Sequence, residues 1–345
     1  MSDLALYRRY RPSKFSEVIG QEAAINTLAG SLKLGRTSHA YLLAGPRGTG
    51  KTSVARILAR ELGAEPPDIN EIDAASHRGI DEIRALRDAV LTLPFVSPVK
   101  VYIVDEVHML TREAFNALLK TLEEPPSHVV FILATTEINK VPDTIVSRCQ
   151  TLNFKKPALV DVKKTIEHIA KKEGWKLDAG VADLIALLGD GSFRDAIGEL
   201  QRVMGASPDK KITLAEVEKV SGAPAGGLAL DIVTATVKQD LPAALAAVRA
   251  LENQSGDVKL FTKMILRLGR FLLLGRLAPA IQEELATEMS PDEVKALRAL
   301  QTEAGMSVMP TALRELLTAH EEIAHAHIAT LPLELALMRI ISQDK

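Results

Sequence analysis

The sequence is poor in cysteine and in aromatic residues. Its 345 residues include one cysteine, Cys149, and only 4% aromatics. A single cysteine excludes an intrachain disulfide and any all-cysteine metal site. The longest apolar stretch, residues 265–277, contains three arginines and is shorter than the roughly 20 residues of a membrane-spanning helix. With no signal-peptide pattern, we expect no membrane segment and a reducing, cytoplasmic location.

No single sign of charge prevails over the whole chain. The 42 lysines and arginines nearly balance 44 aspartates and glutamates, and the formal net charge is −2. This excludes a globally basic nucleic-acid-binding protein. The first 60 residues differ, because they hold ten basic and three acidic side chains. That local excess suits partners that carry phosphate, and it is equally compatible with a solvated basic face.

Strand-like and helical segments alternate in the first half of the chain. Short apolar runs predict five strands, at residues 39–44, 69–72, 99–105, 129–134 and 151–154. Helices are predicted at residues 51–62, at residues 80–91, and from a Thr111 cap to the Glu123-Glu124-Pro125-Pro126 stretch. The alternation predicts an α/β fold with a mainly parallel sheet covered by helices.

The strand signals stop after residue 157. We expect a small helical unit as far as residue 222 and helices only from Ala223 onward. Breaks are expected near one glycine and five prolines: Gly256, Pro242, Pro279, Pro291, Pro310 and Pro332. For a chain of this length, the economical division is three domains, at residues 1–156, 157–222 and 223–345.

A glycine-rich segment lies between the first predicted strand and the helix after it. It reads Gly45-Pro46-Arg47-Gly48-Thr49-Gly50-Lys51-Thr52 and matches the phosphate-binding pattern G-x-x-x-x-G-K-[ST]. The glycines allow backbone N–H groups to cradle a phosphate at a helix N-terminus. Lys51 supplies a positive charge to the β- and γ-phosphates, and the Thr52 hydroxyl can ligate Mg²⁺. This segment predicts a P-loop.

Two acidic residues, Asp105 and Glu106, end the apolar third strand. Neighbouring side chains point in different directions at a strand end, so the two carboxylates can have different roles. We expect Asp105 to help hold Mg²⁺ and Glu106 to orient the attacking water. The acids are also compatible with a helix start or a solvent-facing turn.

Three further polar positions are candidates for the same site. Thr136 ends the fourth strand and can contact the water or the γ-phosphate; Thr135 is the second choice, and ordinary turn chemistry is a third. Arg148, just before the fifth strand, can act on a neighbouring subunit's γ-phosphate, although its pattern favours a surface salt bridge. Arg194 opens a helix and can reach the nucleotide in its own chain or form an ion pair within that helix.

These residues belong to a longer series that resembles a known family. The N-terminal box Tyr10-Arg11-Pro12, Phe15, Val18 and Gly20-Gln21-Glu22 is similar to that of clamp-loader ATPases of the AAA+ class. The segments at residues 105–110, 116–126, 134–136, 147–149 and 191–196 resemble the gamma/tau subunit of bacterial DNA polymerase III. The resemblance is dense over residues 4–200 and weak beyond Ala223.

The resemblance implies an ATP- and Mg²⁺-dependent subunit of a pentameric ring that loads a sliding clamp onto primer–template DNA. Lys51, Thr52, Asp105 and Glu106 would act on ATP in the same chain. Thr136 would be the first sensor, Arg148 the trans-acting finger and Arg194 the second sensor. The box would line the adenine, through Tyr7, Tyr10, Arg11, Pro12, Val18 and Ile19. The last domain would be the oligomerisation collar.

Two features depart from the family's pattern, and one assignment is weaker. Many members carry a four-cysteine zinc module where this chain has residues 61–67 without cysteine, so we expect no zinc. We also expect no polymerase- or helicase-binding tail beyond Lys345 in this sequence. For DNA, the resemblance points to helix N-termini inside the ring, with Ser76, Arg78 and Lys120 as candidates or as ordinary solvated residues.

Two other functions fit parts of the same sequence. A branch-migration motor or helicase loader shares the P-loop and acidic pair, and we expect such a machine to form hexamers. A non-hydrolysing scaffold subunit is disfavoured by the presence of Lys51, Thr52, Asp105 and Glu106 together.

Overall fold

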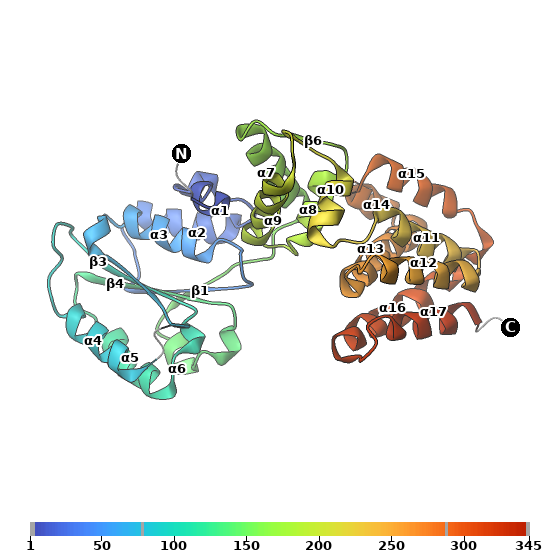
Figure 1. Cartoon of the computed structure of the whole chain (residues 1–345). Helices are drawn as coiled ribbons and strands as arrows, with labels where there is room; N and C mark the ends of the chain where they lie inside the picture. Colours follow the sequence, from blue (N-terminus) through green and yellow to red (C-terminus); the bar gives the residue numbers. More distant parts are fainter. Residues whose placement is uncertain (1–3, 77–78, 287–288, 343–345) are drawn as a thin grey trace. The chain divides into compact units, whose positions relative to one another are not determined.

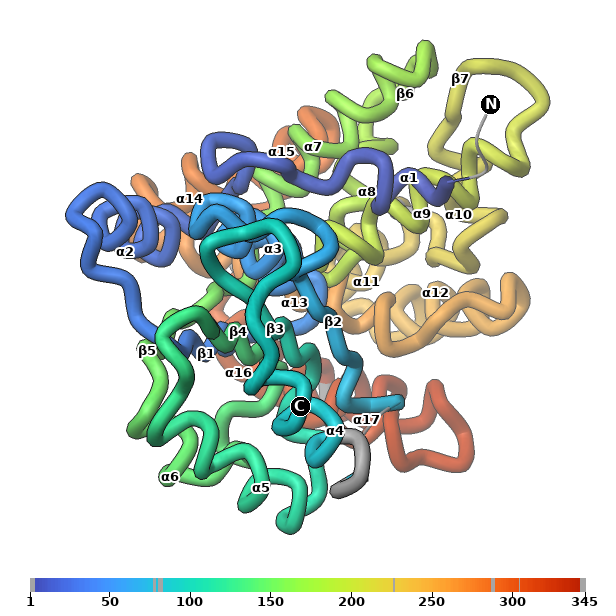
Figure 2. The backbone as a smooth tube through the Cα atoms, turned by 90° about the vertical axis from the view of Figure 1, so that its left-hand side faces the viewer, coloured from blue at the N-terminus to red at the C-terminus, as the bar shows by residue number. Residues whose placement is uncertain are grey.

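The computed structural model describes residues 4–76, 79–286 and 289–342. A five-stranded parallel sheet forms the centre of the first half, with the strand order β2-β3-β4-β1-β5 that can be followed across Figure 2. The strands are β1 (Ala40–Ala44), β2 (Ile69–Asp73), β3 (Lys100–Asp105), β4 (Val129–Thr135) and β5 (Gln150–Asn153). The predicted parallel α/β sheet is therefore present, with each strand displaced by no more than one residue at either end.

Helices cover both faces of this sheet (Figure 1). One face carries α2 (Glu22–Lys33) and α3 (Lys51–Glu61), and the other carries α4 (Ile80–Val90), α5 (Arg112–Glu123) and α6 (Asp143–Val146). Each face has its own apolar core, with Leu28 and Leu58 in the first and Phe115 and Leu118 in the second. The central strands are buried on both sides, which explains their continuous apolar sequence.

Close packing divides the chain into two compact units. The first comprises described residues of 1–162 and 191–195, and the second comprises described residues of 163–190 and 196–345. The short helix α1 (Leu6–Arg9) belongs to the first unit. The three-domain division made from the sequence stays a prediction.

The small helical unit expected over residues 157–222 also contains two strands that the sequence did not predict. Two short strands, β6 (Lys176–Leu177) and β7 (Lys211–Ile212), pair in parallel among α7 (Leu159–Lys172), α8 (Val181–Leu188), α9 (Phe193–Ala206) and α10 (Leu214–Ser221). A two-residue strand is too short to show an alternating pattern, so the sequence has no signal for it. The pairing depends on a contact between segments far apart in the chain.

Helices make up the regular structure described beyond Ala223, and they share one core that includes Phe261, Phe271 and Leu337. They are α11 (Gly226–Val237), α12 (Leu241–Asn253), α13 (Val258–Leu277), α14 (Pro279–Ala286), α15 (Pro291–Leu300), α16 (Met309–Glu322) and α17 (Leu331–Ser342). Each of the five prolines lies at the first or second position of a helix, where a missing N–H costs no hydrogen bond. Among the described residues, no helix is long and apolar enough to cross a bilayer.

Candidate nucleotide-binding site

The glycine-rich segment forms a tight loop between β1 and the N-terminus of α3. Gly50 precedes α3 with φ of 100°, and Gly48 has φ of 73°, both in the region that side chains avoid. A β-carbon at Gly48 would lie 1.8 Å from the Ser192 hydroxyl oxygen, and one at Gly45 would lie 2.2 Å from the Phe154 carbonyl oxygen. Because a helix N-terminus has unpaired N–H groups and a positive dipole end, this loop is suited to an anion.

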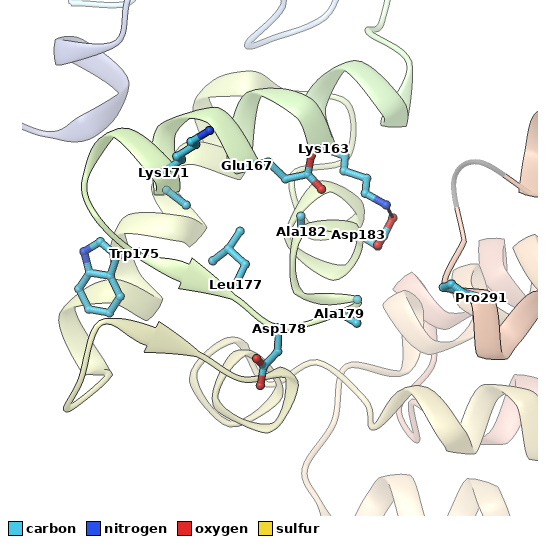
Figure 3. A pocket seen from close by; sticks show the side chains of 12 residues that line it. Lys163, Glu167, Lys171, Trp175, Leu177, Asp178, Ala179, Ala182, Asp183 and Pro291 are labelled. Atoms are coloured by element: carbon cyan, nitrogen blue, oxygen red, sulfur yellow. Dashed lines mark ion pairs between the residues drawn. The ribbon is translucent and has the colours of Figure 1, made fainter.

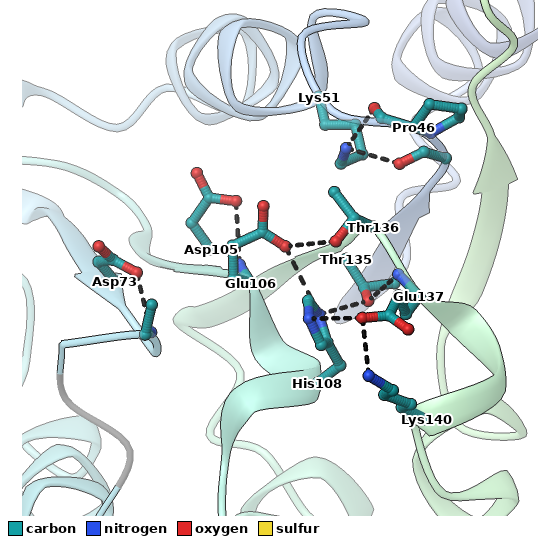
Figure 4. A network of polar contacts seen from close by, with 12 residues as sticks. Pro46, Lys51, Asp73, Asp105, Glu106, His108, Thr135, Thr136, Glu137 and Lys140 are labelled. Carbon is teal, nitrogen blue, oxygen red and sulfur yellow. Dashed lines mark hydrogen bonds and ion pairs between the residues drawn. The ribbon is translucent and has the colours of Figure 1, made fainter. Parts of the chain in front are cut away.

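Lys51 is buried within the same loop (Figure 4). Its Nζ donates to the carbonyl oxygens of Gly45 at 2.7 Å and Pro46 at 2.8 Å. Burial lowers the pKa of Lys51, and the carboxylates of Glu106 and Asp105 oppose that shift. The ammonium is therefore held between the loop and the acidic pair, where a phosphate group would meet it.

Thr52 and Asp105 lie side by side although 53 positions separate them in the chain. The Thr52 hydroxyl donates to Asp105 Oδ2 at 2.7 Å, from the first turn of α3 to the end of β3. Hydroxyl and carboxylate oxygens are the ligands that Mg²⁺ prefers. The residues predicted to hold the metal are thus neighbours, and their chemistry fits Mg²⁺.

Glu106 adopts an uncommon backbone conformation directly after β3. Its φ of 49° and ψ of 44° place it in the left-handed region, which costs energy for a residue with a side chain. The Thr136 hydroxyl donates to Glu106 Oε2 at 3.0 Å. Thr135 is fully buried, and its hydroxyl contacts His108 instead. Of the two threonines considered as sensors, Thr136 is the one that contacts Glu106.

The segment around Arg194 lies against the P-loop and the N-terminal box. The Phe193 N–H donates to the Gly48 carbonyl oxygen at 3.1 Å, and Arg47 pairs with Asp195 at 3.7 Å. The Arg194 guanidinium lies 5.0 Å from the centre of the Tyr7 ring. A hydrogen bond from Arg8 lowers the pKa of Tyr7; burial opposes this shift, and the charges of Arg8 and Arg194 add to the lowering.

The other residues of the N-terminal box differ in how far they are buried. Val18 packs on the core beneath α2 and α3, whereas the Ile19 side chain is exposed. Burial lowers the pKa of Arg11, and the nearby charge of Arg56 adds to that shift. The structure thus brings Tyr7 to Arg194, and the role of the whole box in adenine binding stays a prediction.

Arg148 contacts its own chain away from the P-loop. Its guanidinium donates to Glu123 Oε1 at 2.6 Å and to the Thr144 carbonyl oxygen at 2.7 Å, on α5 and α6. The salt bridge expected from the residue pattern is therefore present, and a trans-acting role requires this pair to open. Burial raises the pKa of the neighbouring Cys149 thiol to about 12, so the thiol is unreactive at neutral pH.

Comparisons with known proteins identify the family. A family model described as DNA polymerase III, delta subunit, matches residues 20–78 and 64–158, and one for domain III of the gamma and tau subunits matches residues 212–345. DNA polymerase III subunit tau of Bacillus subtilis is 36% identical over 99% of this chain and 63% of its own length. The tau subunit of Escherichia coli is 34% identical over 99% of this chain and 56% of its own length.

The chain belongs to the DNA polymerase III gamma/tau family. It spans about three fifths of the length of the gamma/tau relatives named above. A solved structure of the Thermotoga maritima RuvB Holliday junction branch migration motor has a TM-score of 0.52 at 24% identity, covering 66% of this chain and 79% of that one. That likeness concerns the fold alone, an AAA+ P-loop α/β domain followed by helices.

Gln21, which the sequence analysis named only as part of the N-terminal box, has a structural role in this gamma/tau chain. It is buried, its Nε2 donates to the carbonyl oxygens of Lys155 at 2.8 Å and Thr49 at 3.4 Å, and its Oε1 accepts from the Lys155 N–H at 3.0 Å. Gln21 therefore ties the N-terminal box to the P-loop and to the end of β5. One glutamine before a helix has no local signal for such a role.

Two of the three residues predicted to contact DNA, Ser76 and Lys120, lie among the described residues. Ser76 lies after β2, where its hydroxyl donates to Asp73 Oδ2 at 3.4 Å. Arg78 lies outside the described residues. Lys120 is exposed but occupies the last turn of α5, not a helix N-terminus as expected.

A hollow of about 390 Å³ lies in the second unit, away from these residues (Figure 3). Trp175 lines it and is half-buried. Three of the charged residues that line the hollow form ion pairs: Lys163 contacts Asp183 at 2.8 Å, and Asp178 contacts Lys211 at 3.0 Å. Glu167 and Lys171 also line the hollow.

Proposed function

We propose that this chain is an ATP-hydrolysing subunit of a DNA polymerase III clamp loader, which uses ATP and Mg²⁺ to load a sliding clamp onto primed DNA. The observation that carries the proposal is the contact between Thr52 and Asp105 beside Lys51. It places a magnesium-binding oxygen pair next to a phosphate-binding lysine, as nucleotide hydrolysis requires.

The side chains have separate roles in this proposal. Lys51 binds the β- and γ-phosphates, and Thr52 and Asp105 hold Mg²⁺, which when bound neutralises charge on the phosphates. Glu106 orients and polarises the attacking water, and Thr136 holds the Glu106 carboxylate. Arg194, beside Tyr7, approaches the nucleotide from the helix that follows the P-loop contact.

Two substitutions test these roles by different readouts. Lys51→Ala removes the phosphate-binding charge, so affinity for a fluorescent ATP analogue should fall at least about tenfold. Glu106→Gln keeps the shape but removes the base, so binding should persist while hydrolysis falls about 10²–10⁴-fold. Wild-type protein that binds no adenine nucleotide, or that binds ATP without hydrolysing it in the presence of clamp and primed DNA, would contradict the proposal.

We infer that the partners include a sliding clamp. Four apolar side chains of the loop between α4 and β3 support this, because Leu91, Leu93, Phe95 and Val96 are between 69% and 84% exposed. Exposed apolar side chains that lie together in one patch mark interaction sites. Phe95→Asp should weaken clamp binding in a pull-down and leave ATP affinity unchanged; equal clamp binding would remove this loop from the interface.

Other ring subunits are the second class of partner. Leu331, Leu335 and Met338 recur every three or four residues along α17 and are all about 40% exposed, at 42%, 41% and 39%. This spacing aligns them on one helix face, which suits packing against a neighbouring collar. We propose a pentameric ring; native mass spectrometry with clamp and partner subunits distinguishes it from the hexamer of a branch-migration motor.

Primer–template DNA is the third partner in this proposal, with Ser76, Arg78 and Lys120 as candidate contacts. The exposed position of Lys120 supports its availability to a phosphate. Lys120→Ala should lower affinity for primed DNA and reduce its salt dependence. Unchanged DNA binding after the charges of both Lys120 and Arg78 are removed would reject the assignment. We also propose that the chain uses no zinc, because residues 61–67 carry no cysteine, and that it acts in the cytoplasm.

A further inference from the structure

His108 lies at the centre of a polar network beside the acidic pair (Figure 4). It belongs to the short 3₁₀ helix Val107–Met109 that follows Glu106, and its side chain is 6% exposed. Its Nδ1 shares a hydrogen bond with the Thr135 hydroxyl at 3.0 Å and lies 3.5 Å from Glu106 Oε2. Its Nε2 lies 3.6 Å from Glu137 Oε1.

The neighbours of the imidazole are themselves fixed. The Thr135 hydroxyl oxygen accepts from the Glu137 N–H at 3.0 Å, and Lys140 donates to Glu137 Oε1 at 2.9 Å. The hydrogen bond from Lys140 lowers the pKa of Glu137; burial opposes this shift, and the charges of Lys140 and His108 add to the lowering. The ring is therefore placed between two carboxylates, with Glu106 on its Nδ1 side and Glu137 on its Nε2 side.

Glu106 itself has few other restraints. It has left the strand, it adopts a left-handed backbone conformation, and its side chain is 30% exposed. The described polar contacts of its carboxylate are with Thr136 at 3.0 Å and with His108 at 3.5 Å. These two side chains approach the same oxygen, Oε2, which leaves Oε1 available for a water.

We propose that His108 is a positioning residue for hydrolysis, which holds the Glu106 carboxylate in register with the phosphate loop through the Thr135–His108–Glu137 network. The inference rests on the proposed ATPase function. A carboxylate that must align a water tolerates little displacement, since an error of about 1 Å can lower a rate by about 10²-fold. In this proposal His108 affects the rate of hydrolysis. It does not affect nucleotide affinity, which depends on Lys51 and the P-loop.

Three substitutions separate this role from simple packing. His108→Ala removes both contacts, His108→Asn keeps a polar atom near the place of Nδ1, and His108→Gln keeps one near the place of Nε2. We expect kcat to fall about tenfold or more in His108→Ala with little change in ATP affinity, and His108→Asn to recover more activity than His108→Gln.

His128 provides the matched control in the same unit. Its Nε2 lies 3.3 Å from the Val90 carbonyl oxygen and 3.2 Å from that of Thr92, at the C-terminal end of α4. His128→Ala should therefore reduce thermal stability while kcat of the folded protein stays at the wild-type value. A parallel loss of kcat in both variants would show that stability alone explains the effect.

A double-mutant comparison tests the network and covers the case in which His108→Ala does not fold. Glu137→Gln keeps the size of the side chain. It should lower kcat by a smaller factor than the factor by which kcat of His108→Asn exceeds that of His108→Ala. In the His108→Asn/Glu137→Gln variant, the effects should not add, because both residues act through Glu106. Wild-type kcat in every His108 variant, or a change in KM alone, overturns the inference. Absence of hydrolysis in the wild type instead overturns the ATPase proposal.

Discussion

At the scale of single residues, Asp68 shows how a buried charge shapes an exposed surface. Its carboxylate is fully buried and accepts the N–H groups of Phe95 at 2.6 Å, Val96 at 3.0 Å and Ser97 at 2.9 Å. Burial alone would raise the pKa of Asp68, but these N–H groups and the Ser97 hydroxyl lower it to about 2. The apolar loop proposed to contact the clamp is therefore held in one conformation, which reduces the entropy lost on binding.

Asp68→Asn replaces an acceptor by a group whose amide hydrogens face three donors. We expect lower stability and weaker clamp binding at pH 7. Because the folded pKa lies below the unfolded value, the stabilisation by Asp68 is present above about pH 4 and is lost as the pH falls through about 2. Melting curves of both proteins should therefore converge toward low pH; a constant difference down to pH 2 would contradict the assigned charge.

At the scale of elements, helix ends depend on a few identifiable side chains. The Thr111 hydroxyl oxygen accepts from the Ala114 N–H at 3.2 Å, as the sequence predicted for the start of α5. Two capping boxes, Thr213 with Glu216 and Ser290 with Glu293, start α10 and α15 in the same way. Helix α5 also carries Glu123, which contacts Arg148, the proposed trans-acting finger. The Thr111 cap therefore stabilises the helix that holds the partner of Arg148.

Thr111→Ala removes the acceptor at the N-terminus of α5. The expected cost is about 1 kcal/mol of unfolding free energy, and Thr111→Ser should restore most of it because serine keeps the hydroxyl. Chemical denaturation of the three proteins measures the effect. A loss in the serine variant as large as that in the alanine variant would mean that the methyl group, not the cap, matters.

At the scale of the whole molecule, the proposed reaction needs residues from two subunits: the P-loop of one and Arg148 of its neighbour. Arg148 contacts α5 and α6 of its own chain, while Lys51, Thr52 and Asp105 are gathered at the P-loop. An arginine finger contributes about 10³–10⁵-fold to hydrolysis when a partner supplies it. The proposed function, with Arg148 as a trans-acting finger, therefore requires assembly as well as the fold of one chain.

Mixing two inactive variants tests the trans role of Arg148. Arg148→Ala should bind ATP normally but hydrolyse it slowly in the assembled ring. Subunits with Glu106→Gln still carry Arg148, so mixed rings should regain part of the lost activity. Arg202→Ala is a matched control, because Arg202 forms an exposed pair with Glu199 on its own helix. Normal hydrolysis by Arg148→Ala rings would rule out the finger.

The exposed face of α17 makes a separate prediction about assembly. Leu335→Glu places a charge where a neighbouring collar is proposed to pack, so association with partner subunits should weaken in analytical ultracentrifugation. ATP affinity of the single chain should be unchanged, because Leu335 belongs to the second unit and the P-loop to the first. Unaltered association would show that this face is not the interface.

Much of the α/β unit was predictable because its signals are local. The glycine pattern, the apolar strand before Asp105 and the Thr111 cap each depend on neighbouring residues in the chain. The two-residue strands β6 and β7 were missed, since their pairing joins residues 35 positions apart, Lys176 with Lys211. Lys120 lies in the last turn of α5, as the predicted helix bounds imply, so its assignment to a helix N-terminus came from the resemblance alone.

The sequence by itself determined the parallel sheet, the P-loop and the acidic pair, because glycine conformation, strand burial and residue spacing are encoded locally. Only the tertiary structure decided that Thr136 and not Thr135 contacts Glu106, that Gln21 joins the box to the loop, and that His108 lies between two carboxylates. Those contacts connect segments that are separated in the chain. Packing across neighbouring strands and loops determines which side chains face one another.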